Sequence, residues 1–379
     1  MKKNLLIPAV AAALVIGAAP AWAAAPSATL DRKALTSSLK AMADSGVYGV
    51  QSSVRAGAHS WRGAAGVADI ETRRPMKAGM YHRIGSITKT FTAAAVLREV
   101  GLGRIKLDEP VNTYVPGLIP GQRGKRITVR MLLNHTSHVG DHIRKLFGSL
   151  EAFDDNQFRT FSRRELARIG LAEKPTGEPG ARPGSYSNVN YAIAGLVLEK
   201  VTGQRAETYI TRHIIKKAGL RHTFFPRSAY LPQPHPKAYE GLEGQMKPER
   251  DYSVYDMSWA NLGGSLVSTM DDVNRYYRLL LRGKVIGRAQ VKEMLETAPI
   301  YVSPGVKLDY GLGIARVKTP CGTFWSHTGL VWGFVTAHYT SADTRRQLTI
   351  GYNRTTLPKA TGKPLGRHTL QALCGSVKP

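Results

Sequence analysis

Three short motifs in this chain supply the groups that acyl transfer by a serine nucleophile needs. They are Ser86-Ile87-Thr88-Lys89, Tyr186-Ser187-Asn188 and His327-Thr328-Gly329. A seryl hydroxyl is a poor nucleophile until a nearby base takes its proton, and a lysine three positions later on a helix lies on the same face. The sequence therefore predicts that Ser86 is the nucleophile and that Lys89 activates it.

The second motif adds groups for proton transfer and for binding. A phenol held between cations can ionise well below its solution pKa of about 10, so we expect Tyr186 to carry a proton during the reaction. Asn188 offers both an amide donor and an acceptor. These suit a substrate peptide bond and the orientation of Lys89.

The third motif is expected to end a strand whose edge binds substrate. Gly329 there allows a substrate backbone to approach closely, so an extended acyl-peptide would add along that edge. We expect Thr328 to donate a side-chain hydrogen bond to the substrate. The backbone amides of Ser86 and Leu330 would hold the developing oxyanion. For His327, a structural role inside the strand stays open.

Each motif is weak by itself, and the chain contains its own control. Ser37 and Lys40 also fit the pattern S-x-x-K, in an amphipathic stretch with no other feature of a site. By inspection, the patterns Y-x-N and [HK]-T-G each occur once, and both lie downstream of Ser86. The catalytic interpretation therefore rests on all three motifs occurring together. The alternatives are a surface serine and lysine on an ordinary helix, and a loop tyrosine beside an N-cap asparagine.

The elements that must position these motifs follow from hydrophobic periodicity. Helices are expected over 31–45, 86–100, 271–281 and about 365–373. Strands are expected over 48–56 and 60–68, joined by a turn at Gly57, and over 322–327, 334–341 and 346–352. Ser86 would then lie at a helix N-terminus, where backbone N–H groups are unpaired. The N-terminal hairpin and the C-terminal strands are expected to share one antiparallel sheet.

The middle of the chain is predicted to form a separate helical lobe. Residues from about 107 to 236 are helix-compatible and punctuated by prolines, so the α/β part comprises about 24–106 and 237–379. With 379 residues, of which 42% are hydrophobic, the chain has the length for one large domain or two interlocked ones.

The N-terminus has the pattern of a signal peptide over residues 1–23. Lys2 and Lys3 precede an apolar run over 5–19, and Ala21-Trp22-Ala23 fits an A-x-A cleavage site. We therefore expect a secreted protein that begins near Ala24. A membrane anchor is the alternative, although the run is short and interrupted by prolines and a glycine.

Cysteine content agrees with export. Cys321 and Cys374 are the two cysteines, and we expect them to form a disulfide, which on the simple loop model stabilises the fold by about 4 kcal/mol. Two free buried thiols are the alternative. No Cys/His cluster has metal-ligand spacing and no H-E-x-x-H occurs, so neither a metal nor another cofactor is expected.

The formal net charge is +26. Basic clusters such as Arg123-Gly124-Lys125-Arg126 are suited to anionic wall polymers or phospholipid head groups, and a solvated basic surface without one partner is the alternative. Nucleic acid is a poorer explanation, because export removes access and no known binding module is present.

With these motifs in place, the sequence resembles the serine β-lactamase and penicillin-binding-protein superfamily, in particular its exocellular D-alanyl-D-alanine carboxypeptidase type. That type carries S-x-x-K, Y-S-N and H-T-G. Further segments that look like family segments are Leu132-Leu133-Asn134-His135-Thr136-Ser137, Gly263-Gly264-Ser265-Leu266-Val267-Ser268-Thr269 and Tyr310-Gly311-Leu312-Gly313. The resemblance implies an α/β (α+β) fold, with an antiparallel sheet flanked by helices, an all-helical lobe and the site between them.

The resemblance also implies roles. Ser86 would be acylated, Lys89 and Tyr186 would manage protons, Asn188 and Thr328 would hold substrate, and His327 would replace the lysine common in class C β-lactamases. Acylation would expel the C-terminal residue, and water or an amine would release the acyl group. β-Lactams would then act as inhibitors. No E-x-x-L-N segment is found, so penicillin hydrolysis by the class A route is not favoured.

Two departures from the family pattern bear on specificity. His138 stands where many relatives have glycine, and Leu330 and Trp332 would place apolar groups beside the third motif. Relatives that bind a free terminal carboxylate use cationic side chains, for which Arg316 is the candidate.

Three functional hypotheses follow. The first is a secreted carboxypeptidase that removes the terminal D-Ala from D-Ala-D-Ala peptides such as peptidoglycan stem peptides. The second is an esterase or β-lactamase of the same fold, which the apolar Leu330 and Trp332 favour somewhat. The third is a basic wall-binding protein that has the fold without turnover, which replacement of Ser86 by alanine would reveal.

Overall fold

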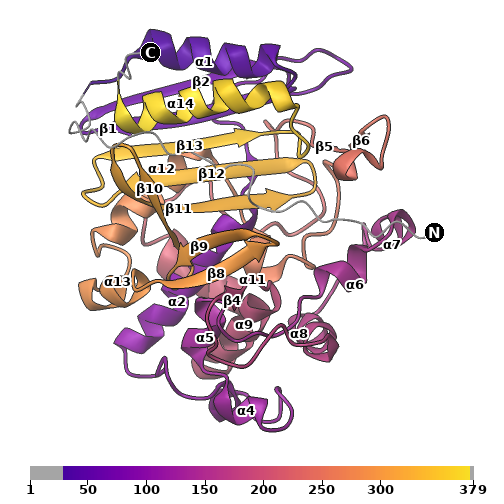
Figure 1. Ribbon diagram of the computed structural model, residues 1–379, viewed down its shortest axis with the longest axis vertical. Coiled ribbons are helices and arrows are strands. Elements are labelled where there is room, and N and C mark those ends of the chain that lie inside the picture. Colours follow the sequence, from indigo (N-terminus) through magenta and orange to yellow (C-terminus); the bar gives the residue numbers. More distant parts are fainter. Residues whose placement is uncertain (1–28, 376–379) are drawn as a thin grey trace.

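A nine-stranded sheet is the centre of the molecule (Figure 1). The computed structural model describes residues 29–375. The strand order is β2-β1-β13-β12-β11-β10-β9-β8-β4, and every pair is antiparallel except β4 with β8. The strands are β1 (Gly49–Ala56), β2 (His59–Gly66), β4 (Gly184–Ser185), β8 (Ala298–Ser303), β9 (Val306–Tyr310), β10 (Ala315–Thr319), β11 (Gly322–Val331), β12 (Phe334–Ser341) and β13 (Arg346–Tyr352).

Two small strand pairs lie outside this sheet, β3 (His82–Arg83) with β7 (Val267–Ser268) and β5 (Tyr239–Glu240) with β6 (Arg250–Asp251). The longer helices are α1 (Arg32–Asp44), α2 (Thr88–Gly101), α8 (Arg163–Ala172), α9 (Val189–Thr202), α12 (Met270–Leu281) and α14 (Gly362–Cys374). The shorter ones are α3 (Val111–Tyr114), α4 (Arg123–Arg126), α5 (Val129–Leu133), α6 (Ile143–Phe147), α7 (Leu150–Asp155), α10 (Ala206–Ile210), α11 (Asn261–Gly264) and α13 (Arg288–Met294).

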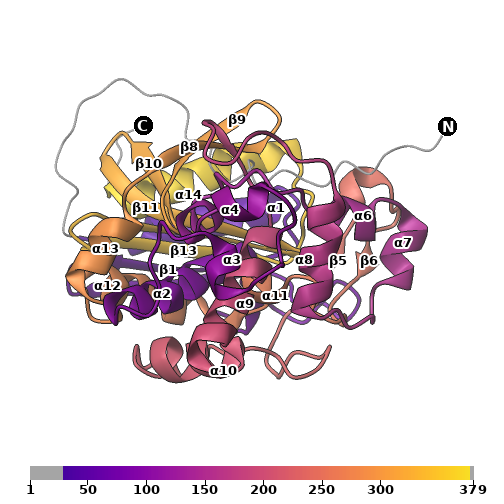
Figure 2. The same cartoon turned by 90° about the horizontal axis from the view of Figure 1, so that it is seen from below.

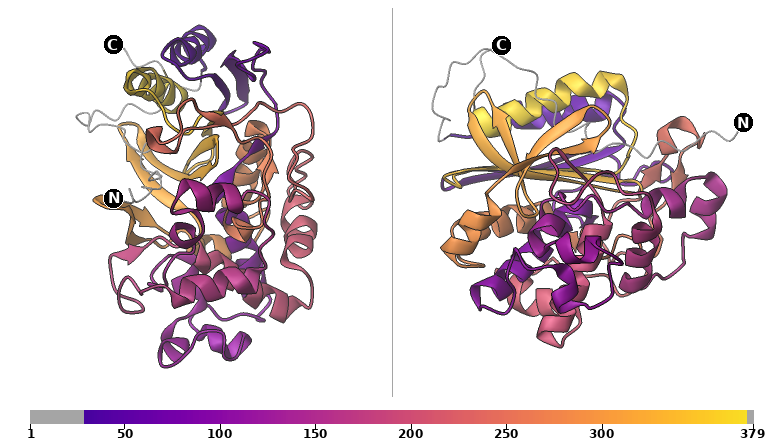
Figure 3. Two further views of the ribbon diagram at one scale, coloured as in Figure 1. Left: turned by 90° about the vertical axis from the view of Figure 1, so that its right-hand side faces the viewer. Right: turned by 60° about the horizontal axis from the view of Figure 1, so that its bottom comes forward.

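Helices cover both faces of the sheet. On one face, α1 and α14 lie side by side, and the apolar stripe Leu35, Leu39 and Met42 of α1 packs into the same buried cluster as strand residues such as Val54. On the other face, α12 packs against β1, β12 and β13, while α2 belongs to a larger apolar cluster shared with the helices below the sheet (Figures 1 and 3). The sheet therefore separates two hydrophobic cores.

Helices α4, α5, α8 and α9 gather below the sheet, and α6 and α7 lie beside β5 and β6 (Figures 1 and 2). The predicted lobe is not purely helical, because β4 leaves it to extend the sheet edge beside β8. A two-residue strand carries no periodicity that a sequence pattern could reveal. Among the described residues, no helix is long and apolar enough to cross a membrane. The predicted signal peptide over residues 1–23 lies outside the described residues.

Much of the sheet was predictable. The helix expected over 31–45 is confirmed by α1, and the hairpin by β1 and β2, with Gly57 at a positive φ of 58°. The strands expected over 334–341 and 346–352 are confirmed by β12 and β13. The strand expected over 322–327 continues to Val331, and β8, β9 and β10 were not predicted.

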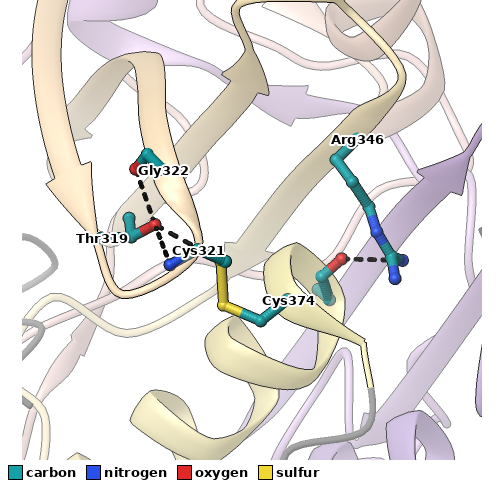
Figure 4. The surroundings of a disulfide bond; sticks show 6 residues. Thr319, Cys321, Gly322, Arg346 and Cys374 are labelled. Carbon is teal, nitrogen blue, oxygen red and sulfur yellow. Dashed lines mark hydrogen bonds between the residues drawn. A yellow bond between two sulfur atoms is a disulfide. The ribbon is translucent and has the colours of Figure 1, made fainter. Parts of the chain in front are cut away.

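The predicted disulfide between Cys321 and Cys374 is confirmed (Figure 4). It joins the turn between β10 and β11 to the end of α14. Nearby, Arg346 Nη1 donates to the carbonyl oxygen of Ala372 at 3.2 Å, which adds a second tie between the sheet and α14. The last helix is therefore attached to the sheet by a covalent bond and by a hydrogen bond.

Candidate active site

Ser86 lies in a tight turn that packs against β11, the middle strand of the sheet. It is the middle residue of a 3-10 turn, Gly85–Ile87, that leads into α2, so the helix expected from Ser86 begins as an α-helix only at Thr88. Gly85 adopts a positive φ of 53°, and a Cβ atom there would lie 2.7 Å from the backbone nitrogen of Leu330. A Cβ on Gly329 would lie 1.8 Å from the carbonyl oxygen of Ile84. The two glycines thus let the turn and β11 pack backbone to backbone.

Lys89 is completely buried one helical turn after the serine. Its Nζ lies 3.0 Å from Ser86 Oγ, 2.7 Å from Asn188 Oδ1 and 2.8 Å from the carbonyl oxygen of Gly263. Burial lowers the pKa of Lys89 to about 7, and the negative charge of Asp141 opposes this shift. A lysine with such a pKa is neutral in a large fraction of molecules near neutral pH, when it can accept a proton.

Tyr186 lies next to both Lys89 and Ser86. Its ring centroid is 4.8 Å from Lys89 Nζ, and its backbone N–H donates to the carbonyl oxygen of Tyr301, just after β4. The expectation that Tyr186 ionises readily is wrong for this state, because burial raises its pKa and the smaller, opposite effect of the Ser86 hydroxyl does not compensate. The phenol oxygen is buried and makes no hydrogen bond of acceptable geometry within residues 29–375. Tyr186 is therefore a neutral phenol at rest.

Asn188 is held by an acidic residue that sequence analysis missed. Asp141 Oδ2 accepts hydrogen bonds from the Asn188 backbone N–H at 2.5 Å and from Asn188 Nδ2 at 3.1 Å. Asn188 is the N-cap residue of α9, but its side chain makes no capping hydrogen bond. Its amide instead bridges Asp141 and Lys89.

His327 is neutral, and its tautomer follows from its neighbours. Its Nδ1 lies 2.7 Å from the carbonyl oxygen of Thr328, which can only accept, so Nδ1 carries the proton. Nε2 must then accept from the hydroxyl group of Tyr310, at 2.7 Å. Burial, assisted by the charge of Lys89, lowers the pKa of His327 to about 3. His327 thus supplies no cation where class C relatives have lysine.

The third motif lies within β11 rather than at its end. Val331 and Phe334 close a two-residue hairpin and form a hydrogen-bonded pair. Because such pairs alternate along an antiparallel ladder, the next pair, Leu330 with Val335, is not hydrogen-bonded. The Leu330 N–H therefore points away from β12, toward the other edge of β11. Among the described residues, no strand pairs with that edge beyond Ser326, where β10 ends its pairing, and the turn at Gly85 packs there instead.

The backbone N–H groups of Leu330 and Ser86 therefore both lie near the nucleophile without a hydrogen-bond acceptor among the described residues. The Ser86 N–H donates to no group in the described part of the chain, and a Cβ on Gly329 would lie 3.1 Å from this nitrogen. The Thr328 hydroxyl is buried, and it too has no hydrogen-bond partner among the described residues. Unsatisfied polar atoms at one place are typical of a site that a substrate completes.

The apolar side chains expected beside the third motif are packed against hydrophobic clusters. Trp332 is buried among other aromatic rings, with its centroid 4.6 Å from that of Phe153 and 5.2 Å from that of Trp259. Leu330 packs against the core beneath α1 and α14. Both side chains therefore contribute to the hydrophobic cores, and this packing alone explains why they are apolar.

The carboxylate-binding candidate and the remaining departure also have structural explanations. Arg316, the candidate for binding a substrate carboxylate, is paired with Asp309 at 2.9 Å on the neighbouring strand. His138 has a positive φ of 55°, which explains why glycine suits this position in relatives. Its ring bonds to the Thr176 hydroxyl and to the carbonyl oxygen of Ala181, so it holds two loops together.

The structure brings Ser86, Lys89, Tyr186, Asn188 and the strand of the third motif together, although they come from distant segments. The residues that sequence analysis missed as contributors are Asp141, Tyr310 and the carbonyl group of Gly263. Gly263 and Tyr310 lie in segments noted for their family resemblance, which gave them no role. No group of three or more His, Cys, Asp or Glu side chains within residues 29–375 is arranged to hold a metal ion.

A buried serine and lysine packed against the middle strand of an antiparallel sheet define a serine hydrolase that works by acyl transfer. A family model described as Beta-lactamase matches residues 39–371. The chain therefore belongs to the β-lactamase family, which groups it with penicillin-binding proteins and D-aminopeptidases.

Known proteins similar to this chain agree with that assignment. The crystal structure of a D-stereospecific amidohydrolase from Streptomyces sp. superimposes with a TM-score of 0.81 and 32% identity, covering 92% of this chain and 100% of that one. A D-aminopeptidase from Cereibacter sphaeroides is 26% identical over 338 residues, which are 86% of this chain and 60% of that protein. A penicillin-binding protein from Bacillus subtilis is 25% identical over 297 residues, 75% of this chain and 63% of that protein. The chain thus spans less than two thirds of the length of these two sequence relatives.

Proposed function

We propose that this protein hydrolyses amide bonds formed by the carboxyl group of a D-amino acid residue, through an acyl-enzyme on Ser86. The observation that carries the proposal is the completely buried Lys89, whose Nζ lies 3.0 Å from Ser86 Oγ. Burial lowers the pKa of Lys89 to about 7, so the amine is available as a base in the range where most hydrolases work.

In the first step, neutral Lys89 takes the proton of the Ser86 hydroxyl as Oγ attacks the acyl carbon. The carbonyl oxygen becomes an oxyanion, which the N–H groups of Ser86 and Leu330 are oriented to stabilise. Asn188 and the carbonyl oxygen of Gly263 hold the resulting ammonium group of Lys89 in place.

In the second step, the carbon–nitrogen bond breaks and the leaving amine takes a proton from the hydroxyl group of Tyr186. A neutral phenol is the form that can donate, and burial raises the pKa of Tyr186, which keeps it in that form. The Lys89 ammonium then returns a proton to Tyr186. A water molecule attacks the acyl-enzyme by the same route in reverse and releases Ser86.

The D-amino acid substrate class is supported by the relatives, because the Streptomyces enzyme is described as a D-stereospecific amidohydrolase and the Cereibacter one as a D-aminopeptidase. Removal of D-Ala from D-Ala-D-Ala peptides is a narrower form of the same proposal. It receives less support from the site, because Arg316 is already paired with Asp309 and His327 is neutral. Acylation of Ser86 by β-lactams is the corresponding expectation for inhibitors, supported by the penicillin-binding relative.

The test is a comparison of substrates with the mature protein. D-Phenylalaninamide, D-alanine p-nitroanilide and diacetyl-Lys-D-Ala-D-Ala are assayed beside their L-enantiomers, with Ser86→Ala as the control. Hydrolysis of D-substrates that disappears in Ser86→Ala supports the proposal. Equal rates on D- and L-substrates, or hydrolysis of simple esters alone, would contradict the D-amino acid assignment.

We also propose that the protein is exported and acts near an anionic cell wall. The signal-peptide pattern over residues 1–23, the net charge of +26 and the disulfide support this, because disulfides persist in oxidising compartments. Expression with the full leader and mass analysis of the culture medium tests export, and a mature N-terminus at Ala24 is the expected result. Retention of an uncleaved chain inside the cell would contradict it.

A further inference from the structure

The Asp141 carboxylate accepts hydrogen bonds from its own loop and from Asn188 in the site. The residue lies between α5 and α6, and its side chain is 27% exposed. Its Oδ1 accepts from the backbone N–H of Ile143 at 2.9 Å, which fixes the carboxylate to the start of α6. Its Oδ2 accepts from both N–H groups of Asn188 described above.

These contacts determine which way the Asn188 amide faces. A carboxylate only accepts hydrogen bonds, so the Asn188 nitrogen must face Asp141 and the Asn188 oxygen must face Lys89. The opposite orientation would turn an NH₂ group toward the Lys89 amine and a carbonyl oxygen toward the carboxylate. Both contacts would then be unfavourable, so Asp141 selects the orientation that binds Lys89.

Asp141 also places a negative charge beside a buried amine. The other titratable side chains around Lys89 come from the loop after α5 (His135 and His142), from the segment between β4 and α9 and from α9 itself (Tyr186 and Tyr191), and from β11 (His327). Burial lowers the pKa of all three histidines and raises the pKa of both tyrosines. These groups are therefore uncharged at neutral pH, which leaves Asp141 as the carboxylate that raises the pKa of Lys89 against its burial.

We propose that Asp141 is a positioning residue, which orients the Asn188 amide toward Lys89 and holds a negative charge next to the Lys89–Ser86 pair. The inference rests on the proposed function, since it assumes that Ser86 is the nucleophile. It adds to that function a residue outside the three motifs, which tunes the pH range in which the nucleophile is activated.

The experiment follows the rate at which a fluorophosphonate probe labels Ser86 between pH 5 and 9, measured by intact-protein mass spectrometry. The probe requires only an activated serine, so it does not depend on the identity of the substrate. Asp141→Asn removes the charge at nearly constant shape, and Asp141→Glu retains it. Asp44→Asn is the matched control, because Asp44 is an exposed aspartate that pairs with Lys40 on α1.

In the wild type and in Asp44→Asn, labelling is expected to rise with a midpoint near pH 7. In Asp141→Asn the midpoint is expected about one pH unit lower, because a nearby carboxylate no longer favours the ammonium form. The plateau rate is expected to fall about tenfold, since Asn188 loses a charge-assisted hydrogen bond. In Asn188→Ala, where the amide is absent, adding Asp141→Asn is expected to leave the plateau unchanged.

A midpoint that stays at the wild-type pH in Asp141→Asn would overturn the inference, and so would plateau losses that simply add in the double variant. If Asp141→Asn does not fold, Asp141→Glu still tests the charge, because a shifted midpoint in that variant contradicts it. The two proposals fail separately. Labelling that shifts as expected without hydrolysis of any D-substrate would contradict the substrate assignment and support the role of Asp141.

Discussion

The chain contains two S-x-x-K segments with very different surroundings. Ser37 and Lys40 lie on the outer side of α1, where Lys40 is 75% exposed and pairs with Asp44, itself 61% exposed, at 2.7 Å. Ser86 is 8% exposed and Lys89 is completely buried, and the lysine bonds to the serine, to Asn188 and to a backbone carbonyl group.

The difference lies in the surroundings and not in the spacing of the two residues. On α1 the ammonium group stays in water, where a surface ion pair contributes little. At Lys89, burial disfavours the charged form, and two further oxygen atoms, from Asn188 and Gly263, fix the amine beside the Ser86 hydroxyl. A sequence motif of this length thus becomes a reactive pair only where the fold removes water and supplies partners.

The largest expected effect is on the nucleophile. Ser86→Ala should lower kcat/KM for D-amino acid amides by at least about a thousandfold, while Ser37→Ala should leave it unchanged. Steady-state kinetics on both variants measure this. If the two variants lose activity equally, the contrast between the two segments is wrong.

The next effect distinguishes two roles for Lys89, a base that accepts a proton and a fixed positive charge. Lys89→Arg keeps a positive charge that arginine does not release, so it should lower kcat by a few hundredfold. Lys40→Arg, made at the exposed segment, should match the wild type. Wild-type kcat in Lys89→Arg would mean that a fixed cation suffices and that Lys89 is not the proton acceptor.

A third prediction concerns the layer formed by α1 and α14, because α1 contains Ser37 and Lys40. The disulfide closes a loop between residues 53 positions apart and ties α14, which packs on α1, to the sheet. Replacing both Cys321 and Cys374 by serine should lower the free energy of unfolding by about 4 kcal/mol, with kcat unchanged. Urea unfolding and kinetics on the same sample check this, and a parallel loss of kcat would show that the site depends on that layer.

A fourth prediction concerns the pH dependence of stability. The pKa of Lys89 is about 7 in the folded protein against an ordinary value of 10.5, so its burial destabilises the fold fully below pH 7, and the penalty fades as pH rises toward 10.5. Lys89→Met should therefore be more stable than the wild type at pH 6. The gap should shrink by about 1.4 kcal/mol per pH unit between pH 7 and 10.

Denaturant unfolding at several pH values measures the gap. Lys40→Met is the control, because it makes the same substitution in the exposed segment. If the difference in the free energy of unfolding between Lys89→Met and the wild type does not change with pH, burial does not lower the pKa of Lys89 in the folded state.

The regular helices and strands could be predicted because their hydrophobic patterns depend on residues close together in the sequence. Alternating side chains predict β12 and β13, and the apolar stripe of α1 follows the helical period. The strands β8, β9 and β10 were missed because they are short and half-exposed, with charged residues such as Lys307 and Asp309 that give no clear alternation. β11 was cut short at His327, although its pairing with β12 runs to the turn at Trp332.

The site was predictable as a set of residues but not as a set of contacts. The three motifs identified Ser86, Lys89 and Tyr186, which the fold then brings together. Asp141 acts on Asn188 across a separation of 47 residues, and Tyr310 on β9 donates to His327 on β11, although these two strands are not neighbours in the sheet. The expected ionisation of Tyr186 failed for a related reason, since the burial that raises its pKa arises only when distant segments pack.

The most direct test of the central claim is to locate the covalent adduct that a fluorophosphonate forms with the protein at pH 8. The labelled protein is digested and the modified residue is identified by mass spectrometry, with Ser86→Ala and Ser37→Ala treated in parallel. The account predicts one adduct, on Ser86, that persists in Ser37→Ala and is absent from Ser86→Ala. An adduct on any other residue, or labelling that survives in Ser86→Ala, would contradict the assignment of the buried pair as the reactive one.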